Sequence, residues 1–154
     1  MARPASPIQA DRRRVKGKFA LAEVALSEHY RSYIACLNRQ DWAGLGHFVD
    51  DDVRHNGRRL GLSGYREMLV KDFEDIPNLR FQIDLLVCEG ARVAARLLFD
   101  CEPKGEFLGL KVAGRHVSFA ENVFYEFNAM KITSVWSIID KAAIEAQLCA
   151  SRTV

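Results

Sequence analysis

A carboxylic acid at the end of an apolar segment is the first candidate for chemistry. Asp140 closes a stretch from Met130 to Ile139 that alternates like a β-strand, and parity places Asp140 on the same face as Trp136. Burial on an apolar face disfavours the charged form of a carboxyl group and raises its pKa. Such a group can take and return a proton near neutral pH, so Asp140 is predicted to be a general acid/base. The alternative is a structural role as the N-cap of a helix that begins at Lys141.

Glu121 is a second carboxylic acid, and it interrupts an apolar row. By the same parity it shares its face with five large residues: Val117, Phe119, Val123, Tyr125 and Phe127. One role open to it is that of a second acid/base or a polar group of a substrate pocket. Alternatively, Glu121 could lie at a dimer interface or form a salt bridge with a cation such as Arg96.

Two further side chains are candidates by type and position. His55 precedes the turn signal Asn56-Gly57, so it is predicted to lie near a strand end, where it could orient a substrate carbonyl or relay a proton. An ordinary, partly exposed loop histidine is the alternative. Trp136 is predicted to line the pocket and to offer its indole N–H, with plain core packing as the alternative.

Helical periodicity dominates the first half of the chain, and strand periodicity dominates the second half. Alternation from Leu79 to Val87, for example, places the odd-numbered residues on one face. Helices are predicted over 19–38, 42–48 (capped by Asp41), 64–74 (capped by Ser63) and 141–148, and strands over 53–55, 79–87, 93–101, 116–127 and 130–139. Helices followed by sequential strands favour an α+β domain, in which an antiparallel meander curves over the helices and leaves a cavity.

Length and composition are typical of one globular domain. The chain has 154 residues, of which 49% are hydrophobic and 27% charged, and no apolar run is long enough to span a membrane. Residues 1–18 carry six basic residues and one acidic residue, which leaves 16 basic and 19 acidic residues in the remainder. We expect residues 1–18 to form a basic, disordered arm and residues 19–154 to form the folded domain of a cytoplasmic protein. The arm could instead contact nucleic acid or another acidic surface, but the body lacks the basic stripe that favours nucleic-acid binding.

Motifs for metals and cofactors do not occur in the sequence. The four cysteines, Cys36, Cys88, Cys101 and Cys149, form no Cys-x-x-Cys pair and are expected to be reduced and mostly buried. There is also no phosphate-binding glycine motif, no Gly-x-Ser-x-Gly and no acidic or histidine cluster with metal-ligand spacing. The sequence therefore predicts neither a cofactor nor a metal.

Three segments give the chain a resemblance to a known family. They are residues 51–57 (DDVRHNG), 105–117 (GEFLGLKVAGRHV) and 131–140 (KITSVWSIID). In order and spacing they resemble the SnoaL-like polyketide (ester) cyclases of the nuclear-transport-factor-2-like superfamily, from about Val24 to Leu148. One departure is the turn before Lys131, which lacks the glycine that the family usually has there.

The resemblance implies a cone-shaped α+β fold and a catalytic use for the pocket. Helices would pack on a curved, mainly antiparallel sheet, and Asp140 would serve as acid/base in an intramolecular aldol-type ring closure. The implied substrate is a small, apolar, carbonyl-bearing molecule, and isomerisation or dehydration are related possibilities. His116 falls at a variable position of the family's loop and is a candidate for substrate binding, with an ordinary surface position as the alternative.

The same fold also serves proteins that do not catalyse reactions. A non-catalytic domain for ligand binding or dimerisation is therefore the alternative function. Domains of this superfamily commonly pair through the sheet, so the resemblance implies a homodimer. Leu98 and Phe124 are predicted to lie on the exposed sheet face that would pair.

Overall fold

The structure of the chain, a computed structural model, describes residues 7–150, with the side chains of residue 15 and of residues 17–150. In chain order the elements are α1 (Pro7–Asn38), the short 3-10 helix η1 (Leu45–His47), β1 (Val49–His55), β2 (Arg58–Arg59), α2 (Gly61–Asp75), β3 (Gln82–Glu89), β4 (Arg92–Cys101), β5 (Glu106–Phe107), β6 (Leu110–Lys111), β7 (Val117–Asn128), β8 (Lys131–Ile139) and α3 (Lys141–Ala150).

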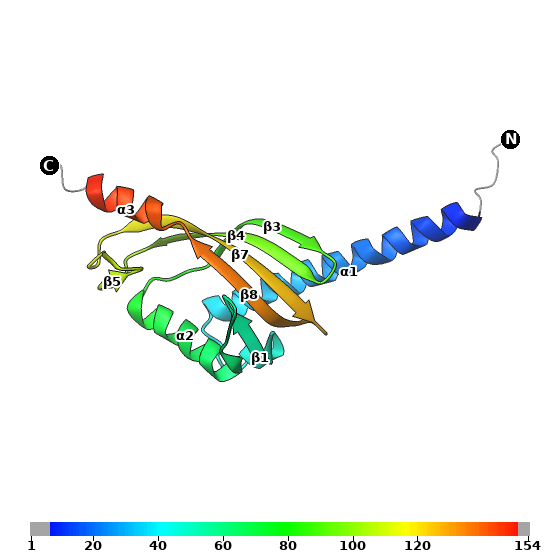
Figure 1. The fold of residues 1–154 in the computed structure, drawn as a ribbon, viewed down its shortest axis with the longest axis horizontal. Helices are drawn as coiled ribbons and strands as arrows, with labels where there is room; N and C mark the ends of the chain where they lie inside the picture. Colours follow the sequence, from blue (N-terminus) through cyan, green and yellow to red (C-terminus); the bar gives the residue numbers. More distant parts are fainter. Residues whose placement is uncertain (1–6, 151–154) are drawn as a thin grey trace.

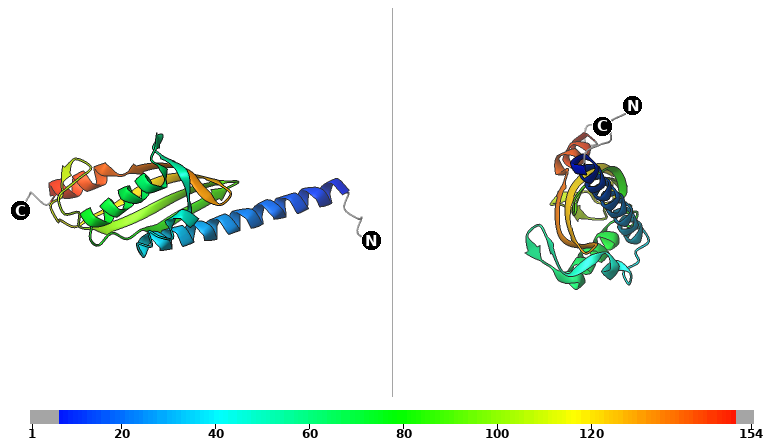
Figure 2. Two further views of the ribbon diagram at one scale, coloured as in Figure 1. Left: turned by 90° about the horizontal axis from the view of Figure 1, so that it is seen from below. Right: turned by 90° about the vertical axis from the view of Figure 1, so that its right-hand side faces the viewer.

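Six strands form one curved sheet in the order β2-β1-β8-β7-β4-β3, and β5 pairs with β6 in a separate hairpin. The four long strands β3, β4, β7 and β8 follow one another as an antiparallel meander, while β1 joins the edge of β8 in parallel. Helix α2 and the second half of α1 cover one side of this sheet (Figures 1 and 2). The predicted α+β cone is therefore confirmed.

The core fills the space between these helices and the concave side of the sheet. Alternation along β4 buries Val93, Ala95, Leu97, Phe99 and Cys101, as the sequence pattern predicts. They belong to one core cluster with Tyr30 and Tyr33, which helical spacing places on one face of α1 and whose ring centroids lie 5.1 and 6.0 Å from that of Tyr125 in β7. Packing in this shared core thus fixes the position of the helices relative to the sheet.

Helix α1 is longer than the sequence pattern predicts. It begins at Pro7 rather than near Phe19, and its first part extends away from the body (Figure 1). Most residues from Asp11 to Ala22 have good helix propensity, which favours helix over a disordered arm. Residues 1–6 of the predicted arm lie outside the described residues.

Two shorter helices also differ from the prediction. The expected helix over 42–48 is only the single 3-10 turn η1, although the Asp41 side chain does accept a hydrogen bond from the Gly44 N–H at 3.0 Å. Helix α2 begins at Gly61, and its N-cap is Leu60 without a side-chain hydrogen bond, so the predicted Ser63 cap is wrong. The turn after β2, with Gly61 at a φ of 68°, already leads the chain into the helix.

Bulges in two strands reverse which side chains face the core. In β3 the pairing shifts after Ile83, so that Leu85 and Val87 are 56% and 51% exposed, against the predicted inward face. In β8 the shift falls at Thr133, because Ile132 pairs with Phe127 and Ser134 with Glu126. A bulge inserts one residue, and every side chain beyond it changes face.

Candidate active site

A cavity of about 230 Å³ lies between α1, α2 and the concave face of the sheet. Most of its lining is apolar and aromatic, with Leu37, Leu69, Phe99 and Phe119 among the walls. A smaller set of polar side chains enters it from five different elements: Tyr33, His55, Tyr65, Asp72, Glu121, Tyr125 and Ser137. An apolar hollow with a few convergent polar groups is the usual form of a small-molecule site.

Glu121 is the carboxylate on the sheet side of the cavity. Its place in the inward-facing row of β7 confirms the parity argument, and the Ser137 hydroxyl of β8 donates a hydrogen bond to its Oε1. Burial raises the pKa of the Glu121 carboxyl, and the hydrogen bond from Ser137 lowers it by a smaller amount. The alternative salt bridge to Arg96 is wrong, because the Arg96 Nε lies 3.2 Å from Asp84 Oδ2.

Asp72 is a second carboxylate of the cavity, and it comes from α2. Burial is the main reason that its pKa rises to about 6, and the nearby charge of Glu121 adds to the rise. Asp72 follows Tyr65 and Leu69 at helical spacing, so the sequence does place a carboxylate in the apolar face of this helix. That signal could have identified Asp72, which the sequence analysis missed.

His55 and a pair of tyrosines complete the polar lining. His55 ends β1, where its ring centroid lies 6.3 Å from that of Tyr65, and burial lowers the pKa of its imidazole. The hydroxyls of Tyr33 and Tyr65 lie 2.8 Å apart and share a buried hydrogen bond. Burial raises the pKa of Tyr33 well above its ordinary value, so its hydroxyl keeps its proton. One hydroxyl hydrogen of the pair therefore remains for a ligand.

Asp140 lies outside this cavity. Its side chain is exposed and accepts a hydrogen bond from the Ala143 N–H at 3.1 Å, which is the N-cap role that the sequence left open. It borders only an open hollow on the outer side of the sheet, beside Arg96 and Asp100. The predicted placement in the cavity is wrong, because the bulge at Thr133 reverses the parity on which it depended.

Two of the predicted substrate-binding residues also lie away from the cavity. Trp136 is 43% exposed on the outer face of β8, displaced by the same bulge, and the bulge turns Val135, Ser137 and Ile139 inward in its place. His116 is exposed as well, with its Nε2 2.6 Å from Asp100 Oδ1. Of the five predicted site residues, the structure therefore brings together His55 and Glu121.

Neither a metal site nor a membrane helix is found among residues 7–150. No group of three or more histidine, cysteine, aspartate or glutamate side chains there could hold a metal ion. Within the same range, every helix is too short or too polar to cross a bilayer.

The fold and this cavity define a class: a cone-shaped α+β domain with ionisable side chains in an apolar hollow. Comparison with known sequences makes the class specific, because residues 27–148 match the sequence profile of the SnoaL-like polyketide cyclases. The chain belongs to this family. No sequence among curated proteins matches it.

Solved structures agree with this assignment. A SnoaL-like polyketide cyclase from Agrobacterium tumefaciens is 58% identical, with a TM-score of 0.79 over 80% of this chain and 97% of that chain. TsrD from Streptomyces laurentii is 27% identical, with a TM-score of 0.68 over 84% and 96% of the two chains. IdmH from Streptomyces antibioticus, at 18% identity, has a TM-score of 0.69 over 80% and 98%, and it supports the fold alone.

Proposed function

We propose that the protein is a cofactor-independent cyclase-type enzyme that acts on a small, apolar, carbonyl-bearing substrate, with Glu121 as the acid/base. The observation that carries the proposal is a carboxyl group of raised pKa inside an apolar cavity that also holds Asp72, His55 and a tyrosine pair. A cavity of about 230 Å³ favours a small substrate, since drug-sized ligands occupy pockets of about 300 Å³ or more. Membership of the cyclase family supports the same reaction class.

The proposed reaction is an intramolecular aldol-type ring closure. The Glu121 carboxylate removes a proton from the carbon next to the substrate carbonyl, and the electrons of that C–H bond move toward the carbonyl oxygen. The free hydrogen of the Tyr33–Tyr65 pair donates to this oxygen and stabilises the enolate. The enolate carbon then bonds to a second carbonyl carbon of the same molecule, and the new alkoxide takes a proton from a carboxylic acid of the cavity.

Asp72 and His55 have supporting roles in this scheme. With a pKa of about 6, part of the Asp72 population carries a proton near neutral pH and can supply the alkoxide. A lowered pKa keeps the His55 imidazole neutral, so one ring nitrogen donates and the other accepts a hydrogen bond. Isomerisation or dehydration would begin with the same proton removal, so the cavity suits these reactions too.

One observation favours a second candidate, a non-catalytic ligand-binding domain of the same fold. Asp140 is the residue that the family resemblance implies as acid/base, and it faces away from the cavity as a helix cap. If no other group takes the acid/base role of Asp140, the cavity binds a ligand without catalysing a reaction. The two candidate functions therefore differ in whether Glu121 acts as the acid/base.

The test is deuterium exchange at the carbon next to a ketone, because enolisation is the first step of the proposed reaction. Acetophenone and 1-tetralone are incubated with the protein in D₂O, and loss of the α-proton signal is followed by NMR. We expect the wild-type chain to accelerate exchange and Glu121→Gln to slow it at least about 100-fold. Asp140→Asn is the matched control and should exchange at the wild-type rate. Ligand-induced chemical shifts without accelerated exchange would instead establish the binding domain.

We propose further that two copies of the chain pair through the outer face of the sheet. The support is the exposure of Phe124 and Leu98, which are 59% and 36% exposed on the face that the sequence predicts. Exposed apolar patches on a sheet of this kind mark interaction surfaces. Size-exclusion chromatography with light scattering measures the mass directly, and a monomer at high concentration would contradict the pairing.

A further inference from the structure

The first part of α1 leaves the body of the protein at the turn between β3 and β4. There the Gly90 N–H donates a hydrogen bond to Glu23 Oε1 at 3.3 Å. The helix continues beyond this point toward Pro7 and extends away from the sheet, as Figure 1 and the left view of Figure 2 show. We call residues 7–23 the arm. The family match covers residues 27–148, so the arm lies outside the matched part of the chain.

The arm carries an apolar row that continues the buried face of α1. Spacings of three and four residues join Val15, Phe19 and Ala22 to the core residues Leu26 and Tyr30. Leu26 and Tyr30 are 3% and 0% exposed, whereas Val15 and Phe19 are 46% and 61% exposed. The apolar row that is buried against the body in the second half of α1 is therefore exposed in the arm.

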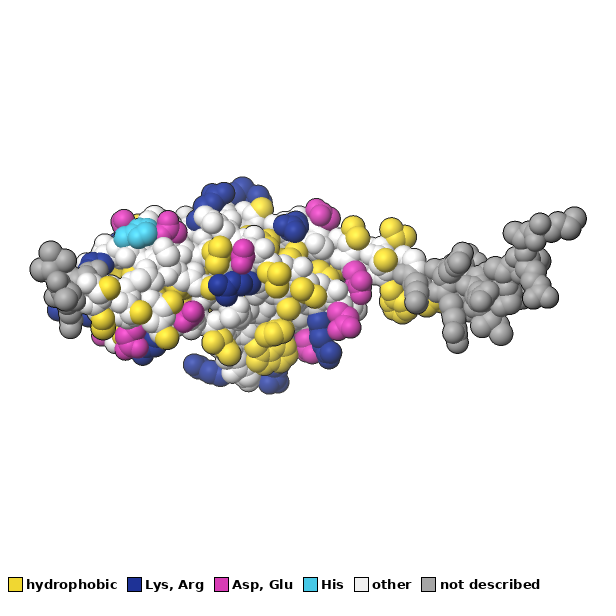
Figure 3. All heavy atoms as spheres, turned by 90° about the horizontal axis from the view of Figure 1, so that it is seen from above, with side chains coloured by type: hydrophobic (Ala, Val, Ile, Leu, Met, Phe, Trp, Pro, Cys, Tyr) yellow, Lys and Arg dark blue, Asp and Glu magenta, His cyan; other side chains and the backbone are white. Residues whose placement is uncertain are grey.

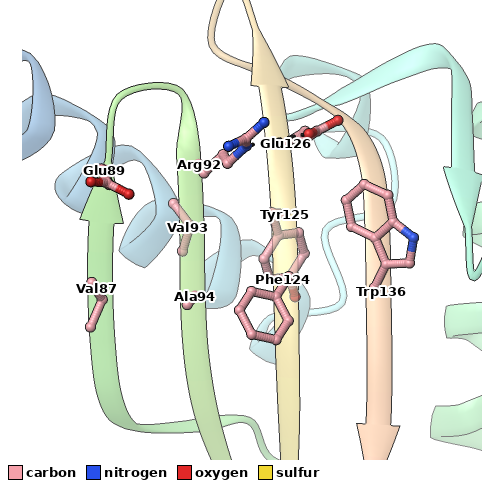
Figure 4. Close-up of a pocket in the computed structure, with 9 residues that line it drawn as sticks. All are labelled: Val87, Glu89, Arg92, Val93, Ala94, Phe124, Tyr125, Glu126 and Trp136. Carbon is pink, nitrogen blue, oxygen red and sulfur yellow. Dashed lines mark hydrogen bonds and ion pairs between the residues drawn. The ribbon is translucent and has the colours of Figure 1, made fainter.

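A groove on the outer face of the sheet is uncovered at the same end of the body. It has a volume of about 410 Å³, and its floor includes Val87, Phe124 and Trp136, which Figure 4 shows on the outer side of three strands. Its rim holds Glu89 and the ion pair of Arg92 with Glu126, whose Nε and Oε1 lie 3.3 Å apart. Figure 3 shows hydrophobic side chains both over this side of the body and on the described part of the arm.

We infer that the arm of one copy lies in the outer groove of a second copy, and that the second arm returns the same contact. This inference rests on the proposed pairing of two copies and names the segment that covers the groove. Two-fold symmetry is compatible with this arrangement, because each chain has one arm and one groove at the same end of its body. A single two-fold rotation then places each arm against the groove of the other copy. Charge favours it as well: the arm holds five basic and two acidic residues, while the charged side chains of the groove are the two carboxylates Glu89 and Glu126 and the one cation Arg92.

Cross-linking between differently labelled copies tests this arrangement. The exposed Cys149 is first replaced by Ser; one copy then carries Val15→Cys in the arm and the other carries Val87→Cys in the groove. After mixing, a short bismaleimide should link the two different copies. Linkage only between two Val15→Cys chains, or only between two Val87→Cys chains, would show arm–arm or sheet–sheet pairing and overturn the inference.

A point substitution gives the second measurement. Phe19→Asp places a charge on the exposed arm, where circular dichroism should show an unchanged fold. Because the symmetric dimer contains the contact twice, we expect its dissociation constant to rise at least about 100-fold. Ile138→Ser is the control: this residue is 75% exposed on the outer face but lies outside the groove, and dimerisation should persist. If the Phe19→Asp protein stays dimeric, the proposed pairing holds and the arm inference fails; if the wild-type chain is monomeric, both fail.

Discussion

Asp72→Asn isolates the cost of keeping a carboxyl group in the cavity. Burial and the neighbouring Glu121 raise the pKa of Asp72 from 3.8 to about 6. The folded protein therefore binds a proton at this site more readily than the unfolded chain does. The stability that comes from the neutral carboxyl is fully present below pH 3.8 and is lost as the pH rises through about 6. Asparagine has a similar shape and stays neutral at every pH.

The magnitude follows from the two pKa values. A change of one pKa unit corresponds to about 1.4 kcal/mol, so the rise from 3.8 to about 6 corresponds to roughly 3 kcal/mol. At pH 8 the asparagine variant should be more stable than wild type by up to this amount. At pH 4 the difference should nearly vanish, because the folded wild type then carries a protonated carboxyl. Urea unfolding at pH 4, 6 and 8, followed by circular dichroism, measures the free energy of unfolding directly.

Asp75→Asn is the matched control on the same helix. Asp75 is three residues further along α2, and its side chain is 54% exposed in a salt bridge with Lys71. Removing such a surface pair changes stability by about 1 kcal/mol or less. A constant stability difference between Asp72→Asn and wild type from pH 4 to pH 8 would contradict a raised pKa of Asp72, and so would a loss of stability in the variant at pH 8.

Four other predictions address the cavity and its surroundings. Glu121→Gln removes a neighbouring charge and should lower the pKa of Asp72, which carboxyl ¹³C chemical shifts report during a pH titration. Tyr33→Phe should cost about 1–3 kcal/mol in urea unfolding because it leaves the Tyr65 hydroxyl buried without this partner; the double Phe variant should cost less than the sum of the two single changes. Asp140→Ala should cost about 1 kcal/mol through loss of the α3 cap, without slowing ketone exchange. Asn38→Ala should destabilise by about 1–3 kcal/mol, because its amide bonds to both the N–H and the C=O of Phe81; an unchanged urea midpoint would show that water replaces these bonds.

Much of the fold could be predicted from the sequence because local patterns agree with tertiary packing. The row of Leu26, Tyr30, Tyr33 and Leu37 is buried as its helical spacing predicts. The alternation along β4 and β7 likewise predicts the buried face correctly, since both strands pair with each other without a register shift. The start of α1 was not predicted, because the basic composition before Phe19 suggests disorder while the same residues have good helix propensity.

The candidate site was harder to predict, because its residues depend on where the sheet changes register. Glu121 lies before any shift in β7, so parity gave its face correctly. Trp136 and Asp140 lie beyond the bulge at Thr133, and parity gave both the wrong face. Nothing in the local alternation marks Thr133 as an inserted residue, since Thr133 and Ser134 suit either face of a strand. Asp72 was within reach of a helical-face argument, but only the folded chain shows that this face and Glu121 share one cavity.

The bulge at Thr133 connects the two surfaces for which we propose functions. Beyond it, β8 presents Ser137 to the cavity, where its hydroxyl donates to Glu121 and so moderates the rise of the carboxyl pKa. The same shift presents Trp136 to the outer groove, where a large apolar side chain is uncovered. In a strand without the bulge, the indole would point into a cavity of about 230 Å³ and Ser137 would face the outside. One inserted residue thus keeps the indole of Trp136 out of the cavity, turns a hydroxyl into it, and leaves an apolar side chain exposed on the outer face. The proposed catalytic site and the proposed dimer contact therefore depend on the same backbone feature.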